Sequence, residues 1–165
     1  MVVGVMSDSH GDAAATAAAV ALLERLGAET LFHCGDVCGD DVLAELAGRT
    51  VHFVWGNCDR VRPEMRALVE RLGLPWPQGP VSVTLGGRRI GVFHGHERAF
   101  RDALADGAFD YVFYGHTHVA DDRRIGGVRA INPGALYRAG VKTVATVDLA
   151  RDEAAWWTLD GRRHR

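Results

Sequence analysis

Five short apolar segments of this 165-residue chain each run into a turn that combines glycine with a metal-binding side chain. The turns are Ser7-Asp8-Ser9-His10-Gly11, Cys34-Gly35-Asp36, Gly56-Asn57-Cys58-Asp59, His94-Gly95-His96 and Gly115-His116-Thr117-His118. Imidazole and carboxylate groups are ligands of divalent transition metals such as manganese, iron, nickel and zinc. Two such ions about 3.5–4 Å apart can lower the pKa of a bound water and stabilise charge on a phosphoryl group. The turns therefore predict a metal centre with hydrolytic chemistry.

Seven side chains in these turns form the candidate ligand set. They are Asp8, His10, Asp36, Asn57, His94, His116 and His118. Asp8 and His10 are two residues apart, as are His116 and His118, so along an extended chain each pair would point the same way. A carboxylate can also bridge two ions, and Asp36 is placed to do so. With two aspartates and a bridging hydroxide, two divalent ions keep a positive charge that favours an anionic phosphate.

A structural role is the alternative for each candidate ligand taken singly. A lone buried histidine or aspartate is usually a hydrogen-bonded polar group rather than a metal ligand. For the whole set to be structural, five strand ends would each have acquired a ligand residue independently. His33 and His52 lie inside strand patterns and are assigned structural roles, and His164 is assigned to the tail.

The elements that must position these turns alternate between strands and helices in the first part of the chain. Short β-branched runs predict strands, and alanine-rich or amphipathic stretches with capping residues predict helices. The expected strands are Val2–Met6, Thr30–His33 and Val51–Trp55, and the expected helices are Asp12–Leu26, Asp40–Ala47 and Pro63–Leu72. This alternation predicts a parallel sheet with covering helices, and the carboxyl ends of such strands open onto a ligand crevice.

After the proline-containing loop Leu74–Pro80 the pattern becomes richer in strands. The expected elements are a hairpin of Val81–Leu85 and Arg89–Phe93, a helix at Glu97–Ala105, and strands at Tyr111–Tyr114, Arg123–Ile125, Val128–Ile131, Thr143–Leu149 and Ala154–Leu159. One partly parallel and one mostly antiparallel sheet with helices outside would make an α/β sandwich. We find no convincing boundary, so residues 1–165 are expected to form a single domain.

The composition excludes several classes of protein. Apolar residues make up 47% and charged residues 24%, and the net charge of −2 gives no basic face for long duplex nucleic acid. The apolar start Val2–Met6 is too short for a signal peptide, and no segment approaches the length of a membrane span. Three cysteines, an odd number, argue against a disulfide framework and favour a reducing compartment. We therefore expect a cytoplasmic protein without membrane partners.

Taken in order, the five motifs resemble the signature of the calcineurin-like metallophosphoesterase superfamily over residues 1 to about 150. The length and the form Gly-Asn-Cys-Asp are similar to its small prokaryotic phosphodiesterase branch. Asn132-Pro133-Gly134 is similar to a loop that this branch places near its site. The resemblance implies a four-layer α/β/β/α sandwich with two mixed sheets. It also implies a small phosphodiester or nucleotide-like substrate and, because this branch often forms dimers or tetramers, a homo-oligomer.

The resemblance further implies two metal sites and a mechanism. Asp8, His10 and His118 would hold the first ion, and Asn57, His94 and His116 the second, with Asp36 bridging the two. Manganese is the first choice of metal, with iron, nickel or zinc as alternatives. Metal-bound hydroxide would attack phosphorus in line with the leaving group.

One position departs from the pattern of the superfamily. Many of its phosphatases carry a histidine directly after the metal-binding asparagine, where it helps to protonate the leaving group, but this chain has Cys58 there. A thiol is a weak hydrogen-bond donor, so monoesters with poor leaving groups should be poor substrates. His96 is the candidate substitute for the proton donor if it faces the cleft, and a supporting or surface role is its equal alternative. Asp59 is expected to cap the following turn, with orientation of a neighbouring residue as the alternative.

Three alternatives follow from the same residues. A retromer coat subunit similar to this family shows that the fold can act as a protein-interaction scaffold, although such a protein tolerates loss of the ligands. His33, Cys34, Cys38 and Cys58 could form a structural zinc site. A nuclease of the same superfamily is the third alternative.

Three arginines follow the predicted site loops: Arg98, Arg101 and Arg138. They are candidates for phosphate contact or for surface ion pairs.

Overall fold

The computed structural model describes residues 1–164, which form ten strands and four helices. In chain order the elements are β1 (Val2–Met6), α1 (Ala13–Arg25), β2 (Ala28–His33), α2 (Asp40–Leu46), β3 (Val51–Phe53), α3 (Pro63–Arg71), β4 (Val81–Leu85), β5 (Arg88–Val92), α4 (Arg98–Asp106), β6 (Tyr111–Phe113), β7 (Asp121–Ile125), β8 (Val128–Asn132), β9 (Thr143–Asp148) and β10 (Glu153–Thr158). Each expected element is present, with ends that differ by at most two residues.

The first sheet has five strands in the order β10-β9-β1-β2-β3. Strands β1, β2 and β3 run parallel, with Val5 opposite Phe32 and Phe32 opposite His52. Strands β9 and β10 are antiparallel neighbours on the other side of β1. The N-terminal βαβ units and the C-terminal hairpin thus share one sheet, which places the loops after β1, β2 and β3 along one edge.

The second sheet also has five strands, in the order β4-β5-β6-β8-β7. Its central strands β5, β6 and β8 are parallel, whereas β4 and β7 pair antiparallel at the two edges. Both sheets are therefore mixed. The loops after β5 and β6 lie at the carboxyl ends of parallel neighbours, as the loops after β1, β2 and β3 do.

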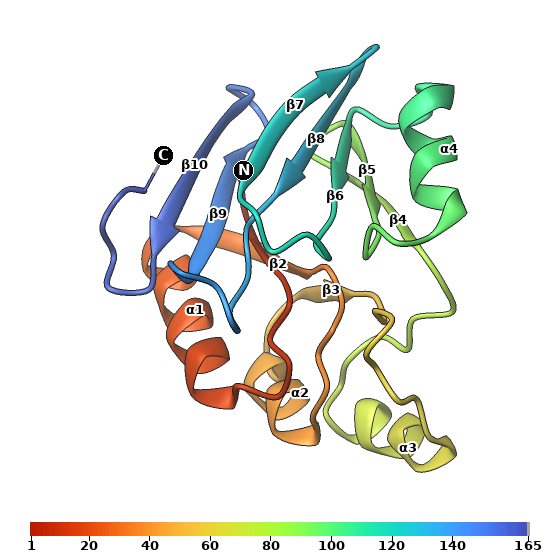
Figure 1. Ribbon diagram of the computed structural model, residues 1–165, viewed down its shortest axis with the longest axis vertical. Helices are drawn as coiled ribbons and strands as arrows, with labels where there is room; N and C mark the ends of the chain where they lie inside the picture. The colour runs from red at the N-terminus through yellow and green to blue at the C-terminus, as the bar shows by residue number, and fades with distance from the viewer. Residues whose placement is uncertain (165) are drawn as a thin grey trace.

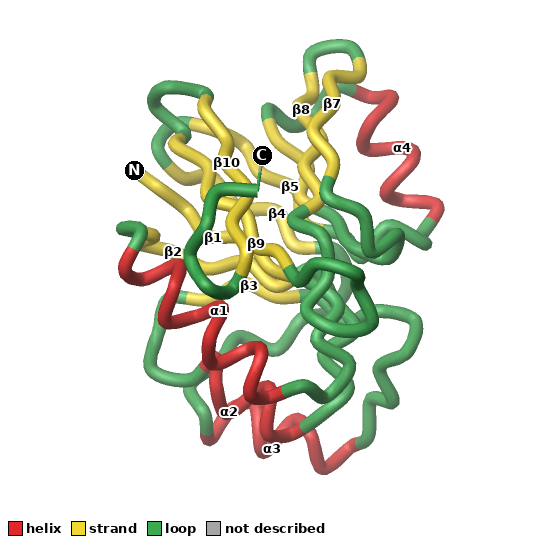
Figure 2. The backbone as a smooth tube through the Cα atoms, turned by 60° about the vertical axis from the view of Figure 1, so that its left-hand side comes forward, coloured by secondary structure: helices red, strands yellow, loops and turns green. Residues whose placement is uncertain are grey.

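Three apolar layers hold the two sheets and the helices together. Helices α1, α2 and α3 cover the outer face of the first sheet, where Leu23, Leu43 and Val69 are buried (Figure 1). Helix α4 covers the outer face of the second sheet through Phe100 and Ala103. The two sheets face one another across the remaining buried residues, and Figure 2 shows the strands between the two groups of helices. The predicted four-layer α/β/β/α sandwich with two mixed sheets is confirmed.

Local chemistry explains where the first helix begins and how the last strand is packed. The Asp12 side chain accepts a hydrogen bond from the Ala15 N–H at 2.9 Å, which caps α1 as expected. In β10, Trp156 lies in the core between the sheets, while Trp157 packs on the side of α1 and donates to the Thr146 hydroxyl at 2.9 Å. Alternation along the strand sends the two indoles into different layers.

Over residues 1–164, none of the helices is long and apolar enough to cross a bilayer.

Candidate metal centre

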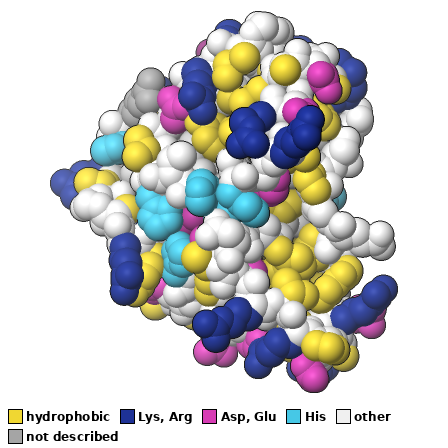
Figure 3. Space-filling view, turned by 45° about the vertical axis from the view of Figure 1, so that its right-hand side comes forward, with side chains coloured by type: hydrophobic (Ala, Val, Ile, Leu, Met, Phe, Trp, Pro, Cys, Tyr) yellow, Lys and Arg dark blue, Asp and Glu magenta, His cyan; other side chains and the backbone are white. Residues whose placement is uncertain are grey.

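The loops after β1, β2, β3, β5 and β6 bring the predicted ligand residues together at one edge of the sandwich. The Asp36 Oδ2 atom lies 3.4 Å from the Nε2 atom of His10 and 3.4 Å from that of His94. On the other side, the His118 Nε2 atom lies 3.3 Å from the Asp8 Oδ1 atom and 3.3 Å from the His10 Nε2 atom. Figure 3 shows histidines gathered around acidic side chains on this face of the molecule.

Donor atoms from these residues fall into groups of the size that a metal ion requires. One atom each of Asp8, His10 and His118 lie within 4.8 Å of one another, and so do one atom each of Asp8, Asp36 and His94. The Asn57 Oδ1 atom lies 3.0 Å from the His94 Nε2 atom. The fourth imidazole of the set, His116, has its ring centre 5.1 Å from that of His94. The structure therefore brings all seven predicted ligand residues to one place.

The backbone of the ligand loops is left-handed rather than extended. Five of the predicted ligands have a positive φ: Asp8 (55°), His10 (44°), Asp36 (54°), His116 (68°) and His118 (60°). The expectation of an extended chain at the two-residue spacings is therefore wrong, because each pair joins two left-handed residues instead. Aspartate and histidine are among the side chains that enter this region most readily, and such strain persists where surrounding contacts hold it.

Two glycines leave room for the two carboxylates. A Cβ atom on Gly56 would stand 2.1 Å from the Asp36 Oδ1 atom, and one on Gly115 would stand 2.6 Å from the Asp8 Oδ2 atom. Real Cβ atoms do not approach oxygen this closely, so each carboxylate packs directly against a glycine backbone. The glycines named by the sequence motifs therefore act through space as well as through turn geometry.

Burial and hydrogen bonding shift the pKa values of the two carboxyl groups in opposite directions. Burial raises the pKa of Asp8, whose side chain is fully buried, in spite of the nearby Ser7, His94 and His118. For Asp36, burial acts in the same direction, but hydrogen bonds from His94 and from the Cys58 backbone outweigh it and lower the pKa. The pKa of His94 is raised in turn. Burial alone would lower it, but the hydrogen bond and the negative charge of Asp36 outweigh burial.

Hydrogen bonds beneath the centre define the orientation of two imidazoles. The His94 Nδ1–H donates to the Cys34 carbonyl at 2.8 Å, which leaves Nε2 facing Asp36 and Asn57. His33 accepts from the Gly35 N–H at 3.2 Å and donates to the Ser9 hydroxyl at 2.8 Å, so it joins the loops after β1 and β2. Burial lowers the pKa of His33 to about 3, which keeps it neutral. The structural role expected for His33 agrees with this geometry.

Two further residues, Asn132 and Asp59, brace the loops, a role that the sequence analysis did not assign to either side chain. The Asn132 amide donates to the Gly115 carbonyl at 2.8 Å and to the Thr117 hydroxyl at 3.1 Å, which holds the loop after β6. Asp59 accepts from the Cys38 N–H and the Gly56 N–H, each at 2.7 Å. The expectation that Asp59 caps the following turn is wrong, because both donors precede it. A buried asparagine followed by Pro-Gly was the signal available for the first.

The candidate proton donors differ in their surroundings. The His96 ring centre lies 5.4 Å from that of His94 and 5.9 Å from that of His116, at the rim of the centre. Cys58 is exposed, and a hydrogen bond to Asp36 is the main cause that raises the pKa of its thiol. The structural zinc reading is wrong: Cys34 is buried between the sheets and His33 bonds to Ser9, so these side chains do not join the exposed Cys38 and Cys58.

Two of the arginines proposed for phosphate contact, Arg98 and Arg138, have different surroundings. Arg98 pairs with Asp102 at 3.6 Å on the surface of α4. Arg138 lies over the Tyr137 ring, 5.1 Å from its centre, and that ring is 5.5 Å from the His10 ring. Of these two arginines, Arg138 is thus the one that ring contacts connect to a predicted ligand, by way of Tyr137.

The residues of this centre fit a divalent metal. The Asp8 Oδ1 atom is buried and has no hydrogen-bond partner within residues 1–164. The His94 Nε2, Asp36 Oδ2 and Asn57 Oδ1 atoms face one another, although all three carry lone pairs when the imidazole is neutral. A buried unpaired oxygen and opposed lone pairs are costly without a cation or a proton between them.

Comparison with known proteins agrees with the fold and the motif order. The sequence pattern of the calcineurin-like phosphoesterase superfamily domain matches residues 1–152. The chain belongs to this superfamily, so it is a hydrolase of the phosphoesterase type, a family that uses divalent metal ions. The resemblance seen in the sequence is confirmed.

Two relatives similar in sequence are prokaryotic phosphodiesterases, and the similar solved structures also include a protein of Entamoeba histolytica. The chain is 27% identical over 159 residues to the phosphodiesterase MJ0936 of Methanocaldococcus jannaschii, covering 93% of this chain and 96% of that protein. It is 30% identical over 146 residues to the phosphodiesterase YfcE of Escherichia coli, covering 79% and 76%. Among solved structures, an archaeal phosphodiesterase superposes with a TM-score of 0.86 at 26% identity, covering 96% and 99%. Vps29 of Entamoeba histolytica, solved with Zn²⁺, superposes with a TM-score of 0.64 at 25% identity, covering 99% and 96%.

Proposed function

We propose that this protein is a phosphodiesterase that depends on two divalent metal ions, with manganese as the first choice. The observation that carries the proposal is the position of Asp36, whose Oδ2 atom is 3.4 Å from the Nε2 atoms of both His10 and His94. A carboxylate equally near two imidazoles from different loops can serve two ions at once. The buried Asp8 Oδ1 atom, which has no hydrogen-bond partner among residues 1–164, supports the same arrangement.

The ligands divide between two positions around Asp36. Asp8, His10 and His118 would hold one ion, and Asn57, His94 and His116 would hold the other. When bound, such a pair supplies positive charge against the phosphate and lowers the pKa of a water. The Cys34 carbonyl and Asn132 act behind the ligands, since they orient His94 and the loop that carries His116.

His96 is the proposed donor of a proton to the leaving group. It lies at the rim beside His94 and His116, and its side chain is 39% exposed, so it can reach both substrate and solvent. Cys58 is the second candidate, but a thiol whose pKa is raised by Asp36 is a poor donor to an oxygen. His96 is therefore the better candidate of the two.

A small phosphodiester, such as a nucleotide-like ester, is the proposed substrate. The two curated relatives described above are both named phosphodiesterases, which supports this class. The net charge of −2 does not favour long duplex nucleic acid. The three free cysteines suit a reducing compartment such as the cytoplasm, which cell fractionation would test.

Hydrolysis of bis(p-nitrophenyl) phosphate with Mn²⁺ tests the proposal. Asp36→Ala and His94→Ala should each lower kcat/KM at least ~10³-fold, about 4 kcal/mol, because each removes a ligand of the centre. Glu70→Ala is the matched control, since it removes an exposed carboxylate whose one ion pair within residues 1–164 is with Arg66 on α3. No turnover with any of Mn²⁺, Fe²⁺, Ni²⁺, Zn²⁺ or Mg²⁺ would overturn the assignment.

The same assay distinguishes His96 from Cys58 as the proton donor when two substrates with different leaving groups are compared. His96→Gln should lower the hydrolysis of diphenyl phosphate at least ~5-fold more than that of bis(p-nitrophenyl) phosphate, because phenolate needs the proton more. Cys58→Ser should change both rates equally and slightly. A uniform loss in His96→Gln would remove it as the proton donor.

A further inference from the structure

A pocket of about 490 Å³ borders the metal centre on the side of the loop that follows β3. Its lining residues are Cys38, Gly39, Asp40, Cys58, Asp59, Arg60, Arg62 and Met65. Cys58 links the two, because its N–H donates to the Asp36 Oδ1 atom at 2.8 Å and its sulfur lies within 4.8 Å of donor atoms of His10 and Asp36. A phosphate at the centre therefore has this pocket directly beside it.

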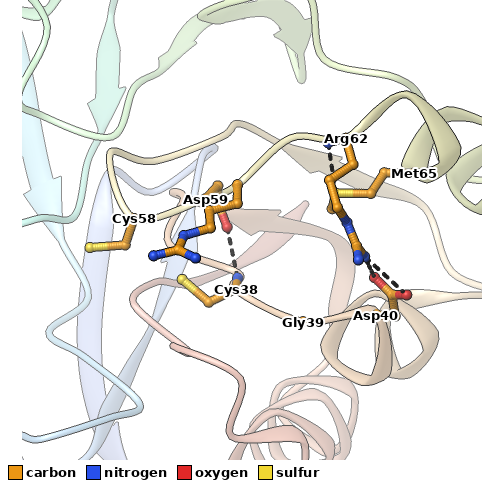
Figure 4. Close-up of a pocket in the computed structure, with 8 residues that line it drawn as sticks. Cys38, Gly39, Asp40, Cys58, Asp59, Arg62 and Met65 are labelled. Atoms are coloured by element: carbon orange, nitrogen blue, oxygen red, sulfur yellow. Dashed lines mark hydrogen bonds and ion pairs between the residues drawn. The ribbon is translucent and has the colours of Figure 1, made fainter.

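Hydrogen bonds hold the walls of the pocket in place. Figure 4 shows the Asp59 carboxylate bonded to the Cys38 backbone and the Arg62 guanidinium directed at Asp40. Asp59 also accepts from the Gly56 N–H at 2.7 Å, and the Arg62 N–H donates to the Met65 sulfur at 3.4 Å. Met65 is only 6% exposed and forms an apolar part of the lining. A pocket with walls fixed in this way needs little reordering to accept a ligand.

Each charged side chain of the pocket lining except Arg60 has a hydrogen-bond or ion-pair partner among the described residues. Asp59 uses both carboxylate oxygens on backbone N–H groups, and Asp40 pairs with Arg62 at 3.3 Å. Arg60 is exposed and makes no ion pair or hydrogen bond with any side chain among the described residues. Its guanidinium is thus the free cation of the lining, with a donor geometry that suits a phosphate or a carboxylate.

We infer that this pocket binds the ester substituent of the phosphodiester and that Arg60 binds a second anionic group on that substituent. The inference rests on the proposed function and names its substrate class: a diester in which one esterified alcohol, such as a nucleoside, carries a further phosphate. The volume falls in the range of small-molecule sites, about 300–1,000 Å³, and exceeds what a single phosphate needs. The lining combines an apolar patch, polar backbone and one unpaired arginine, which fits a nucleotide.

Two substrates that differ by one phosphate test the inference. They are thymidine 5′-(p-nitrophenyl phosphate) and its 3′-phosphorylated form, assayed with Mn²⁺ through the same released p-nitrophenolate. The wild-type protein should prefer the 3′-phosphorylated form by ~10-fold in kcat/KM, as expected for one charge-assisted contact. Arg60→Gln should bring this ratio close to one, and Arg60→Lys should retain part of it.

Arg71→Gln is the matched control, since Arg71 is an exposed arginine on α3 outside the pocket lining. It should keep the wild-type ratio. The inference is overturned if the wild-type protein treats the two substrates alike, or if Arg60→Gln and Arg71→Gln lower the ratio equally, which would indicate only general attraction by net charge. Absence of turnover on both nucleotides and on bis(p-nitrophenyl) phosphate would instead overturn the proposed function.

Discussion

Two aspartates with nearly the same backbone lie at different places in this molecule and have opposite surroundings. Asp8 has a φ of 55° and Asp152 a φ of 56°. Asp152 accepts from the Tyr111 hydroxyl at 2.6 Å and from the Arg129 guanidinium at 2.8 Å, and it also pairs with Arg124. Asp8 accepts a hydrogen bond from the His116 N–H at 3.1 Å, while its other oxygen has no hydrogen-bond partner among the described residues and only faces the His118 Nε2 atom at 3.3 Å.

The two carboxyl groups titrate in opposite directions for this reason. Burial raises the pKa of Asp8, whereas at Asp152 the hydrogen bonds from Tyr111 and the arginines outweigh burial and lower the pKa. An acidic group whose oxygens are fully bonded by the protein contributes to the fold. One that is buried and left unbonded needs a partner from outside the chain. Polar satisfaction, rather than charge or backbone strain, distinguishes the candidate metal centre from a structural cluster.

Asp8→Asn should have the largest effect of the substitutions that test the comparison between Asp8 and Asp152. Turnover of bis(p-nitrophenyl) phosphate should fall ~10³-fold, about 4 kcal/mol, because a ligand is lost. The metal-free protein should become more stable by about 1 kcal/mol, since a carboxyl whose folded pKa is raised costs stability wherever it is ionised. Thermal unfolding in EDTA measures the second effect. A variant that loses stability as well as activity would contradict the reading of Asp8 as an unsatisfied charge.

A smaller effect is expected when the satisfied cluster is broken. Arg129→Leu should lower the free energy of unfolding by about 2 kcal/mol, because Asp122 and Asp152 lose the guanidinium that joins them. Activity per folded molecule should not change. Arg124→Leu is the matched control: its side chain is 56% exposed, so its pair with Asp152 should contribute at most ~1 kcal/mol. Urea denaturation of both variants measures the difference, and equal losses would contradict it.

The smallest effect concerns His33, which is neutral and fully bonded beneath the metal centre. Its folded pKa of about 3 lies below the ordinary value of 6.5, so the unfolded chain binds the proton first and stability falls as the pH drops through this window. Between pH 6.5 and 5.5 the loss from this residue should be about 1 kcal/mol. His33→Gln keeps a donor and an acceptor but takes up no proton, so its stability should change less over this interval. Denaturation of the EDTA-treated proteins at both pH values tests this, and equal slopes would contradict it.

Much of the fold follows from local sequence features. Asp12 caps α1 where the pattern indicates, and a short β-branched run correctly predicts β1. Strand β2 begins at Ala28, two residues before the apolar run, because Ala28 pairs with Val2 across a register shift that no pattern in the sequence marks. The order of the strands within each sheet is the second feature that the sequence does not predict. The placement of β9 between β1 and β10 depends on contacts more than a hundred residues apart in the chain.

The candidate site follows from the sequence in its residue types but not in its geometry. Strand ends rich in aspartate, histidine and glycine identify the loops, and these loops do converge. The left-handed conformation of His10 and His118 could not be predicted, because it depends on contacts such as the bond from the His10 N–H to the Asp36 carbonyl at 2.8 Å. The same holds for the bond between Asp59 and Cys38 and for the bond between Asn132 and Gly115, because each joins two different loops.

The contact between carboxylate and glycine also limits how this centre can change. An alanine in place of Gly56 would put a methyl group where the Asp36 oxygen now lies, and one in place of Gly115 would do the same to Ser7 and Asp8. A homologous chain could thus retain every metal-coordinating residue and still be unable to assemble the centre after a substitution as small as glycine to alanine. Two positions without a side chain are consequently as diagnostic of a working hydrolase as the ligands themselves.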